Sequence, residues 1–229
     1  MRKGDIRKQE ILATAEQLFC RNGYEQTSVQ DIIDCLHSSK GSFYHHYASK
    51  EALLEGICRN RAEQIHSAAA AAADSDSPVR NLDILLSGMI PFRDEKLPFL
   101  IMLLPVFSLP EGRTVREYYC DALSEQFLAD VVSQLSAERE SGELFCEDPE
   151  NTADLILTAV NRLWVKICMT IIETEEKREE HDMSEYLRMA DCCRSCVERF
   201  LSLPYGTLTL TDIPSLRLLI GRIHNHWAQ

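Results

Sequence analysis

Residues 27–50 read TSVQDIIDCLHSSKGSFYHHYASK, and this stretch decides how the chain begins to fold. Ser28 can cap a helix, and Asp31 follows three residues later as the reciprocal acidic partner. Apolar residues then recur at helical spacing: Val29, Ile32, Ile33 and Leu36. His37 and Ser38 interrupt this pattern, after which Ser39 can cap a second helix. The stretch therefore predicts two short helices joined by a tight turn, the helix-turn-helix arrangement that reads a DNA major groove.

The residues on either side predict helices that complete this unit. A first helix is expected from about Asp5 to Arg21, since its apolar residues share one face: Ile11, Ala15, Leu18 and Phe19. Asn22-Gly23 is a stop signal for that helix. Ser49 can cap a long helix that continues to about Ala73. We expect a three-helix core followed by a long connecting helix.

This part of the chain resembles the TetR family of bacterial transcription regulators. The matching segments are residues 27–29, 31–33, 39–47 and 49–53, within a region from about Arg7 to Leu54. The family usually has a small residue or glycine, and then an aliphatic one, where this chain has His37 and Ser38. The resemblance implies an all-α protein, with a helix-turn-helix domain at 1–48 and a larger helical ligand-binding and dimerisation domain at 49–229.

The resemblance also implies which side chains contact an operator in double-stranded DNA. These are Ser28, Gln30, Ser39, Lys40, Ser42, Tyr44, His46 and Lys50. Tyr44 and Lys50 are expected to contact phosphates, which position a protein without specifying sequence, whereas Lys40 and Ser42 are better placed for base edges. Arg2, Lys3, Arg7 and Lys8 form a basic arm that is either a solvated terminus or a further phosphate contact.

Charge is distributed unevenly between the two predicted domains. The net charge is −12, yet residues 1–50 carry seven Lys/Arg against six Asp/Glu, and the remaining residues carry 17 against 30. An acidic body repels phosphate, so only the first 50 residues are expected at DNA. Nine cysteines without a signal peptide indicate the reducing cytoplasm. The longest apolar run, Leu97 to Phe107, is shorter than the roughly 20 residues of a membrane span, so no membrane partner is expected.

Helical periodicity continues through the rest of the chain. Helices are expected at about 78–90, 112–140, 149–172, 184–203 and 212–227. Four prolines between residues 91 and 110 predict short, broken helices there. The acidic run from Glu173 to Glu185 predicts a solvated loop, and the alternation of Thr and Leu from Thr207 to Thr211 suggests a short strand. The 204–229 tail has no feature of the family.

The proline-rich region and the helices after it supply large apolar side chains that suit a ligand pocket. The expected lining is drawn from Met89, Phe92, Phe99, Met102, Tyr119, Leu123, Phe127, Asn161 and Trp164. Such a pocket favours an apolar or aromatic small-molecule effector, oriented by the few polar groups. For any single residue, packing in the core is the alternative interpretation. A ligand that tilts the helix after Ser49 would change the spacing of two recognition helices and release DNA.

Two helical recognition units are needed to read a palindrome, so a homodimer is expected. The resemblance places its interface on helices near 150–172 and 184–203, with Trp164 as an anchor or as core. Cys192, Cys193 and Cys196 leave open a metal- or redox-sensing regulator, although zinc sites usually take four ligands. A helical interaction module with a degenerate DNA head is a further alternative. No catalytic or cofactor-binding motif is found, so an enzyme is not expected.

Overall fold

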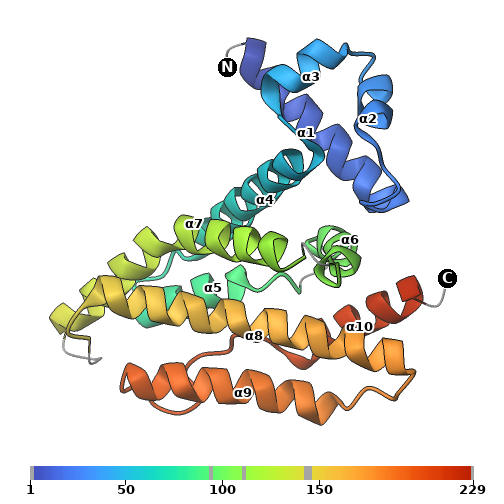
Figure 1. Ribbon diagram of the computed structural model, residues 1–229. Helices are drawn as coiled ribbons and strands as arrows, with labels where there is room; N and C mark the ends of the chain where they lie inside the picture. Colours follow the sequence, from blue (N-terminus) through green and yellow to red (C-terminus); the bar gives the residue numbers. More distant parts are fainter. Residues whose placement is uncertain (1–2, 93–94, 110–111, 142–145, 228–229) are drawn as a thin grey trace. The chain divides into compact units, whose positions relative to one another are not determined.

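The computed structural model describes residues 3–92, 95–109, 112–141 and 146–227 (Figure 1). The described residues form ten helices, α1 to α10, and contain no strand. This confirms the all-α class predicted from sequence. The helices group into two compact units, one of Met1–Arg61 with Pro98–Tyr119 and the other of Ala62–Leu97 with Cys120–Gln229.

The first unit begins with the predicted three-helix core. It consists of α1 (Lys3–Asn22), α2 (Val29–Cys35) and α3 (Lys40–His46) (Figure 1). The buried side chains of this core are Ile11, Leu12, Ala15, Phe19, Tyr24, Ile32, Ile33, Phe43 and Tyr47. The Phe19 and Tyr24 rings meet edge to face at 5.1 Å, which adds an aromatic contact to the buried area. The first helix and the helix-turn-helix therefore fold around a shared apolar centre.

The capping residues behave as the sequence predicted. The Ser28 hydroxyl accepts from the Asp31 N–H at 3.1 Å, while the Asp31 carboxylate accepts from the Ser28 N–H at 2.7 Å. The Ser39 hydroxyl accepts from the Ser42 N–H at 3.2 Å and caps α3 in the same way. Ser49 caps α4 (Lys50–Ala72) through the Ala52 N–H at 3.1 Å. These caps satisfy N–H groups that have no partner inside their helices.

The turn between α2 and α3 is a Schellman motif built on a histidine. His37 has φ of 48°, in the left-handed region, and its N–H donates to the Asp34 carbonyl at 3.1 Å. The Ser38 N–H donates to the Ile33 carbonyl at 3.0 Å, which closes the motif. Glycine is the usual residue at this position, because a Cβ atom is crowded there. The chain therefore makes the tight turn despite its departure from the family pattern.

The described part of the proline-rich region contains one short helix, whereas the sequence predicted several. Helix α6 runs without interruption over Leu97–Phe107 and includes Pro98 and Pro105. Pro98 lies in the first turn, where the missing N–H needs no partner. Helix α7 (Gly112–Ser141) follows after a close turn, in which a Cβ on Gly112 would lie 2.2 Å from the Val106 carbonyl oxygen. Only glycine allows the backbone to approach this closely.

The second unit is organised around α8 (Pro149–Lys177), which contacts α5 (Pro78–Met89), α9 (Met183–Phe200) and α10 (Ile213–Trp227) (Figure 1). Helix α8 is apolar and long enough to span a membrane by length and composition alone, but more than half of its apolar stretch is buried inside the fold. It is thus the core helix of this unit. Trp164 is 0% exposed, so its expected role as an interface anchor is wrong and its role as core is correct.

Two further predictions in the second unit need correction. The acidic run is not one loop, since α8 continues to Lys177 and α9 begins at Met183. Glu and Lys are good helix formers, and Glu175 is held by His181 at 2.7 Å and by His224 on α10 at 3.2 Å. Residues 207–211 form no strand but an irregular loop. The N–H groups of Gly206 and Leu208 donate to the buried Glu198 carboxylate, which fixes the start of that loop.

Candidate DNA-binding site

The predicted DNA contacts lie on α2, on α3 and at the helix that follows. Their exposure divides them into two groups. The exposed side chains are those of Ser28, Gln30, Ser39, Lys40 and Tyr44, and the half-buried ones are those of Ser42, His46 and Lys50. The Tyr44 ring is 53% exposed and packs edge to face on the buried Phe43 at 5.3 Å. A rigid, exposed hydroxyl at this position suits a phosphate contact.

Several of these polar groups also hold the motif together. Ser28 and Ser39 are N-caps, and the Gln30 amide donates to the Asp34 carboxylate on the next turn at 2.6 Å. Hydrogen bonds from the Ser28 hydroxyl and backbone lower the pKa of Asp31. Lys40 is exposed at the start of α3 and forms no ion pair within the described part of the chain. Lys40 is therefore the cation on α3 that is available for an outside partner.

Lys50 has a partner within the first unit. Its Nζ donates to the Tyr24 carbonyl oxygen at 3.1 Å and lies 4.1 Å from the centroid of the Tyr24 ring. A lysine ammonium has three N–H donors, so two remain after the contact with the carbonyl. The contact holds the start of α4 against the segment between α1 and α2. The positive charge of Lys50 therefore lies at the start of α4, directly after the helix-turn-helix.

The basic arm is only partly described. Arg2 lies outside the described residues, as does the side chain of Lys3. Arg7 pairs with Glu10 at 2.7 Å, and Lys8 is exposed. Deeper in the same unit, Arg61 on α4 pairs with Glu16 on α1. Burial raises the pKa of Glu16, and the Arg61 partner opposes that rise. This pair contributes to the packing of α4 against α1 and is separate from the exposed DNA candidates.

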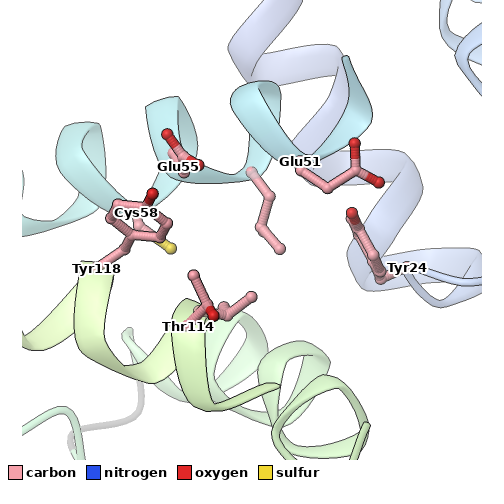
Figure 2. Close-up of a pocket in the computed structure, with 8 residues that line it drawn as sticks. Tyr24, Glu51, Glu55, Cys58, Thr114 and Tyr118 are labelled. Carbon is pink, nitrogen blue, oxygen red and sulfur yellow. The ribbon is translucent and has the colours of Figure 1, made fainter. Parts of the chain in front are cut away.

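The first unit also contains a cavity that the sequence did not reveal. It measures about 120 Å³ and is lined by Tyr24, Glu51, Leu54, Glu55, Cys58, Thr114, Val115 and Tyr118 (Figure 2). The sequence marks Glu51 and Glu55 as favourable charges early in α4, but the cavity arises because α7 lies beside that helix. A pattern within one helix gives no signal for such a long-range approach.

The residues predicted to line a ligand pocket are all buried, but they belong to both units. Phe99, Met102 and Tyr119 are in the first unit, and the other six are in the second. The Asn161 amide donates to the Cys120 carbonyl and the Ser124 hydroxyl, both at 3.0 Å, and its oxygen accepts from the Trp164 indole at 2.9 Å. Asn161 is thus hydrogen-bonded within its own unit. The nine-residue pocket stays a prediction.

The cysteine cluster lies on α9. Cys192 and Cys196 are exposed one helical turn apart, whereas Cys193 is half-buried and donates to the Ala159 carbonyl at 3.7 Å. Burial raises the pKa of Cys193 to about 11, which disfavours its reactive thiolate. Among the residues that the structure describes, no group of three or more His, Cys, Asp or Glu side chains could hold a metal ion.

A capped helix-turn-helix with a half-exposed polar second helix, joined to a larger helical unit, is the arrangement typical of DNA-binding transcription regulators. Residues 11–57 match the family model described as bacterial regulatory proteins, tetR family. Residues 11–57 of the chain therefore have the DNA-binding head of the TetR family. This confirms the resemblance seen in the sequence, and the matched region contains α2, α3 and the start of α4.

Curated relatives are similar over part of the chain. An uncharacterised helix-turn-helix regulator of Bacillus subtilis, YerO, is 29% identical over 127 residues, which is 49% of this chain and 40% of that protein. The repressor KstR2 of Rhodococcus jostii is 42% identical over 53 residues, 23% of this chain and 26% of that protein. The match to each of these two relatives thus spans less than half of the relative's length.

Solved structures extend the likeness to the fold of most of the chain. A complex of SmeT with triclosan has a TM-score of 0.56 at 18% identity and covers 90% of this chain and 98% of that one. At this identity the likeness concerns the fold alone. It agrees with the all-α architecture of both units.

Proposed function

We propose that this regulator is a cytoplasmic repressor that binds a palindromic operator as a homodimer and is released by a small molecule. The observation that carries the proposal is the exposed, capped helix-turn-helix within the segment that matches the tetR family. The name of the repressor KstR2 of Rhodococcus jostii, which is 42% identical over 53 residues, supports the direction of regulation. YerO and KstR2 are both named as helix-turn-helix transcriptional regulators, which supports a regulatory role.

The DNA contacts follow from position and exposure. Lys40 and Ser42 on α3 would reach base edges, and Tyr44 and Lys50 would contact phosphates. Ser28, Gln30, Ser39 and His46 would support these contacts at the edges of the motif. Because the net charge is −12, contact with DNA needs cations that are exposed at the motif itself, and Lys40 is exposed without an internal partner among the described residues.

The proposed dimer uses exposed side chains of α8 and α9, the helices that the resemblance indicates. Leu155 on α8 is 58% exposed and Phe200 on α9 is 49% exposed, and both are large apolar groups. Buried apolar anchors dominate the energetics of interfaces. Leu155 and Phe200 take the place that the sequence had suggested for Trp164, because a side chain buried in its own unit cannot reach a partner.

The proposed effector is apolar or aromatic, and its pocket is built from the nine predicted residues. The triclosan complex of SmeT supports a small-molecule ligand for a protein of this fold. The coupling between ligand and operator need only be about 1–3 kcal/mol, and it must be reciprocal. Sensing through Cys192 and Cys196 is the second candidate, favoured by their exposure one turn apart on α9.

The test of this proposal is a gel-shift assay on the DNA upstream of the protein's own gene, followed by a thermal-shift screen for ligands. A ligand from the screen is then titrated with and without operator. The proposal expects operator to weaken ligand binding by the same factor by which ligand weakens operator binding. Equal ligand affinities in both titrations refute the switch, however tightly the ligand binds. Loss of operator binding on mild oxidation would favour the cysteine alternative.

A further inference from the structure

The cavity in the first unit is lined by residues of α4, of α7 and of the segment between α1 and α2. Glu51, Leu54, Glu55 and Cys58 follow one another at helical spacing and so face the same side of α4. Thr114 and Tyr118 face them from α7, and Tyr24 lies at one end (Figure 2). Val115 of α7 also lines the cavity. Most of the lining is apolar, and the polar groups are two carboxylates, two phenols, a thiol and a hydroxyl.

The charged residues that line this cavity are both acidic. None of the eight lining residues is Lys or Arg, while two are Glu. Glu51 is exposed and Glu55 is half-buried. The pKa of Glu51 is lowered by hydrogen bonds from its own backbone N–H and from the Ser49 side chain, so its carboxylate is ionised near neutral pH. An occupant that is anionic would meet repulsion here, whereas a cation would gain Coulomb energy from both carboxylates.

The aromatic rings of the lining also favour a cation as the ligand. Tyr24 already attracts one cation, since the Lys50 ammonium lies 4.1 Å from its ring centroid. The Tyr118 ring is 45% exposed beside the cavity and carries no such neighbour among the contacts of the described residues. Cations near ring faces gain from the negative electrostatic potential of the ring. Organic ammonium ions are bound in proteins by this combination of rings and apolar surface.

We propose that this cavity is a binding site for a small organic cation with an apolar body, held by Tyr24, Tyr118, Glu51 and Glu55. The site shares no residue with the nine-residue pocket proposed above, and it lies in the unit that contains the helix-turn-helix. Leu54, Val115 and Cys58 would contact the apolar groups of the ligand. Lys50 stays on the Tyr24 ring and carbonyl, outside the lining, and it limits how much positive charge the site accepts.

The size of the cavity selects the probe. An apolar cavity of about 150 Å³ admits benzene, and this one measures about 120 Å³. Tetramethylammonium has fewer non-hydrogen atoms than benzene and carries a single charge on an apolar surface. Tert-butanol is similar in size and shape but neutral, and tetrabutylammonium is too large to enter. A comparison of the three compounds therefore separates the effect of the ligand's charge on binding from the effect of its size.

The experiment titrates each probe into the free, full-length protein and follows backbone amide shifts by NMR. We expect tetramethylammonium to move the signals of Tyr24, Thr114 and Val115, with tert-butanol and tetrabutylammonium at least about tenfold weaker at these signals. E51Q combined with E55Q should weaken tetramethylammonium by about tenfold, because both carboxylates are lost. E63Q removes an exposed carboxylate farther along α4 and serves as the matched control, with unchanged affinity expected.

A second variant protects the test against a folding defect. Tyr118→Leu keeps an apolar side chain on an exposed position and removes the ring, and it should weaken tetramethylammonium without changing the melting temperature. The proposal is overturned if tert-butanol binds as tightly as tetramethylammonium, if E51Q/E55Q binds like E63Q, or if no signal near the cavity moves at saturating probe. Because no DNA is present, these results are independent of whether the proposed operator switch is correct.

Discussion

The replacement of Lys50 by alanine separates a structural role from a DNA-contact role at the same residue. In the free protein, the ammonium group donates to the Tyr24 carbonyl at 3.1 Å and lies 4.1 Å from the Tyr24 ring. A cation over an aromatic ring contributes about 0.5–1 kcal/mol at exposed sites, and a hydrogen bond with a charged donor contributes about 1.5–3 kcal/mol. Lys50 is half-buried, and solvent screens both contacts. We therefore expect Lys50→Ala to lower the free energy of unfolding by about 1–2 kcal/mol.

The same change should remove one phosphate contact from each protomer. The logarithm of the binding constant falls with the logarithm of salt concentration by about 0.9 for each phosphate that a protein neutralises. From about 50 mM to 200 mM salt, each lost contact makes the loss of affinity about 3.5-fold smaller, so one contact fewer in each of two protomers makes it about 12-fold smaller. The overall affinity should also fall by a similar factor on operator and on unrelated DNA, since phosphates carry no sequence information.

The assay is fluorescence anisotropy with operator and scrambled DNA over a series of salt concentrations, together with chemical denaturation. Lys50→Arg keeps the charge and is the control, with the wild-type salt dependence expected. An unchanged salt dependence in Lys50→Ala with an altered sequence preference would refute the phosphate role. Lower stability with unchanged DNA binding would leave Lys50 with its contact to Tyr24 as its sole role.

Three further changes test the packing. His37→Gly should raise the free energy of unfolding by up to about 1 kcal/mol, because glycine has no Cβ atom to be crowded at a left-handed φ of 48°. Urea denaturation measures this change. Gly56→Ala should destabilise by about 1–2 kcal/mol, since the added Cβ would lie 2.9 Å from a ring carbon of the buried Tyr47; Gly221→Ala, with open space around it, should be neutral or stabilising in the same assay. Glu198→Gln should cost about 1–3 kcal/mol, because the carboxylate accepts from two N–H groups of the loop after α9, and thermal melts with an unchanged midpoint would contradict this.

Local patterns predicted the DNA-binding head closely because its decisive contacts span few residues. The Ser28–Asp31 capping box and the Ser39 cap are both made between positions three apart, so the sequence states them directly. His37 was the uncertain position, and its left-handed conformation agrees with the tolerance of histidine there. Three-residue relationships of this kind need no knowledge of the rest of the fold.

The second unit was harder to predict because its features depend on distant partners. The helical end of α8 includes Glu175, which is held by His224 from α10, 49 residues further along the chain. The carboxylate of Glu198 fixes the loop that the Thr-Leu alternation had suggested as a strand. Trp164 was equally compatible with a core or an interface from its spacing, and only the packing of the unit decided for the core.

The cavity beside α4 illustrates the same limit at a candidate site. Glu51 and Glu55 are one helical turn apart, and in sequence they read as favourable charges near a helix start. The structure brings Thr114 and Tyr118 of α7 to the same cavity. Sequence separation of about 60 residues between the two walls leaves no local pattern from which the cavity could be inferred.

The account rests most directly on the claim that two copies of this head read a palindrome. Selection of bound fragments from a random double-stranded DNA library, with the full-length protein at micromolar concentration, tests this claim. The account predicts enrichment of two inverted half-sites, with centres one helical turn or a multiple of a turn apart, roughly 34–36 Å per turn, and a complex of two chains by sedimentation. Enrichment of a single half-site by a monomer, or no enrichment at any salt concentration, would contradict it.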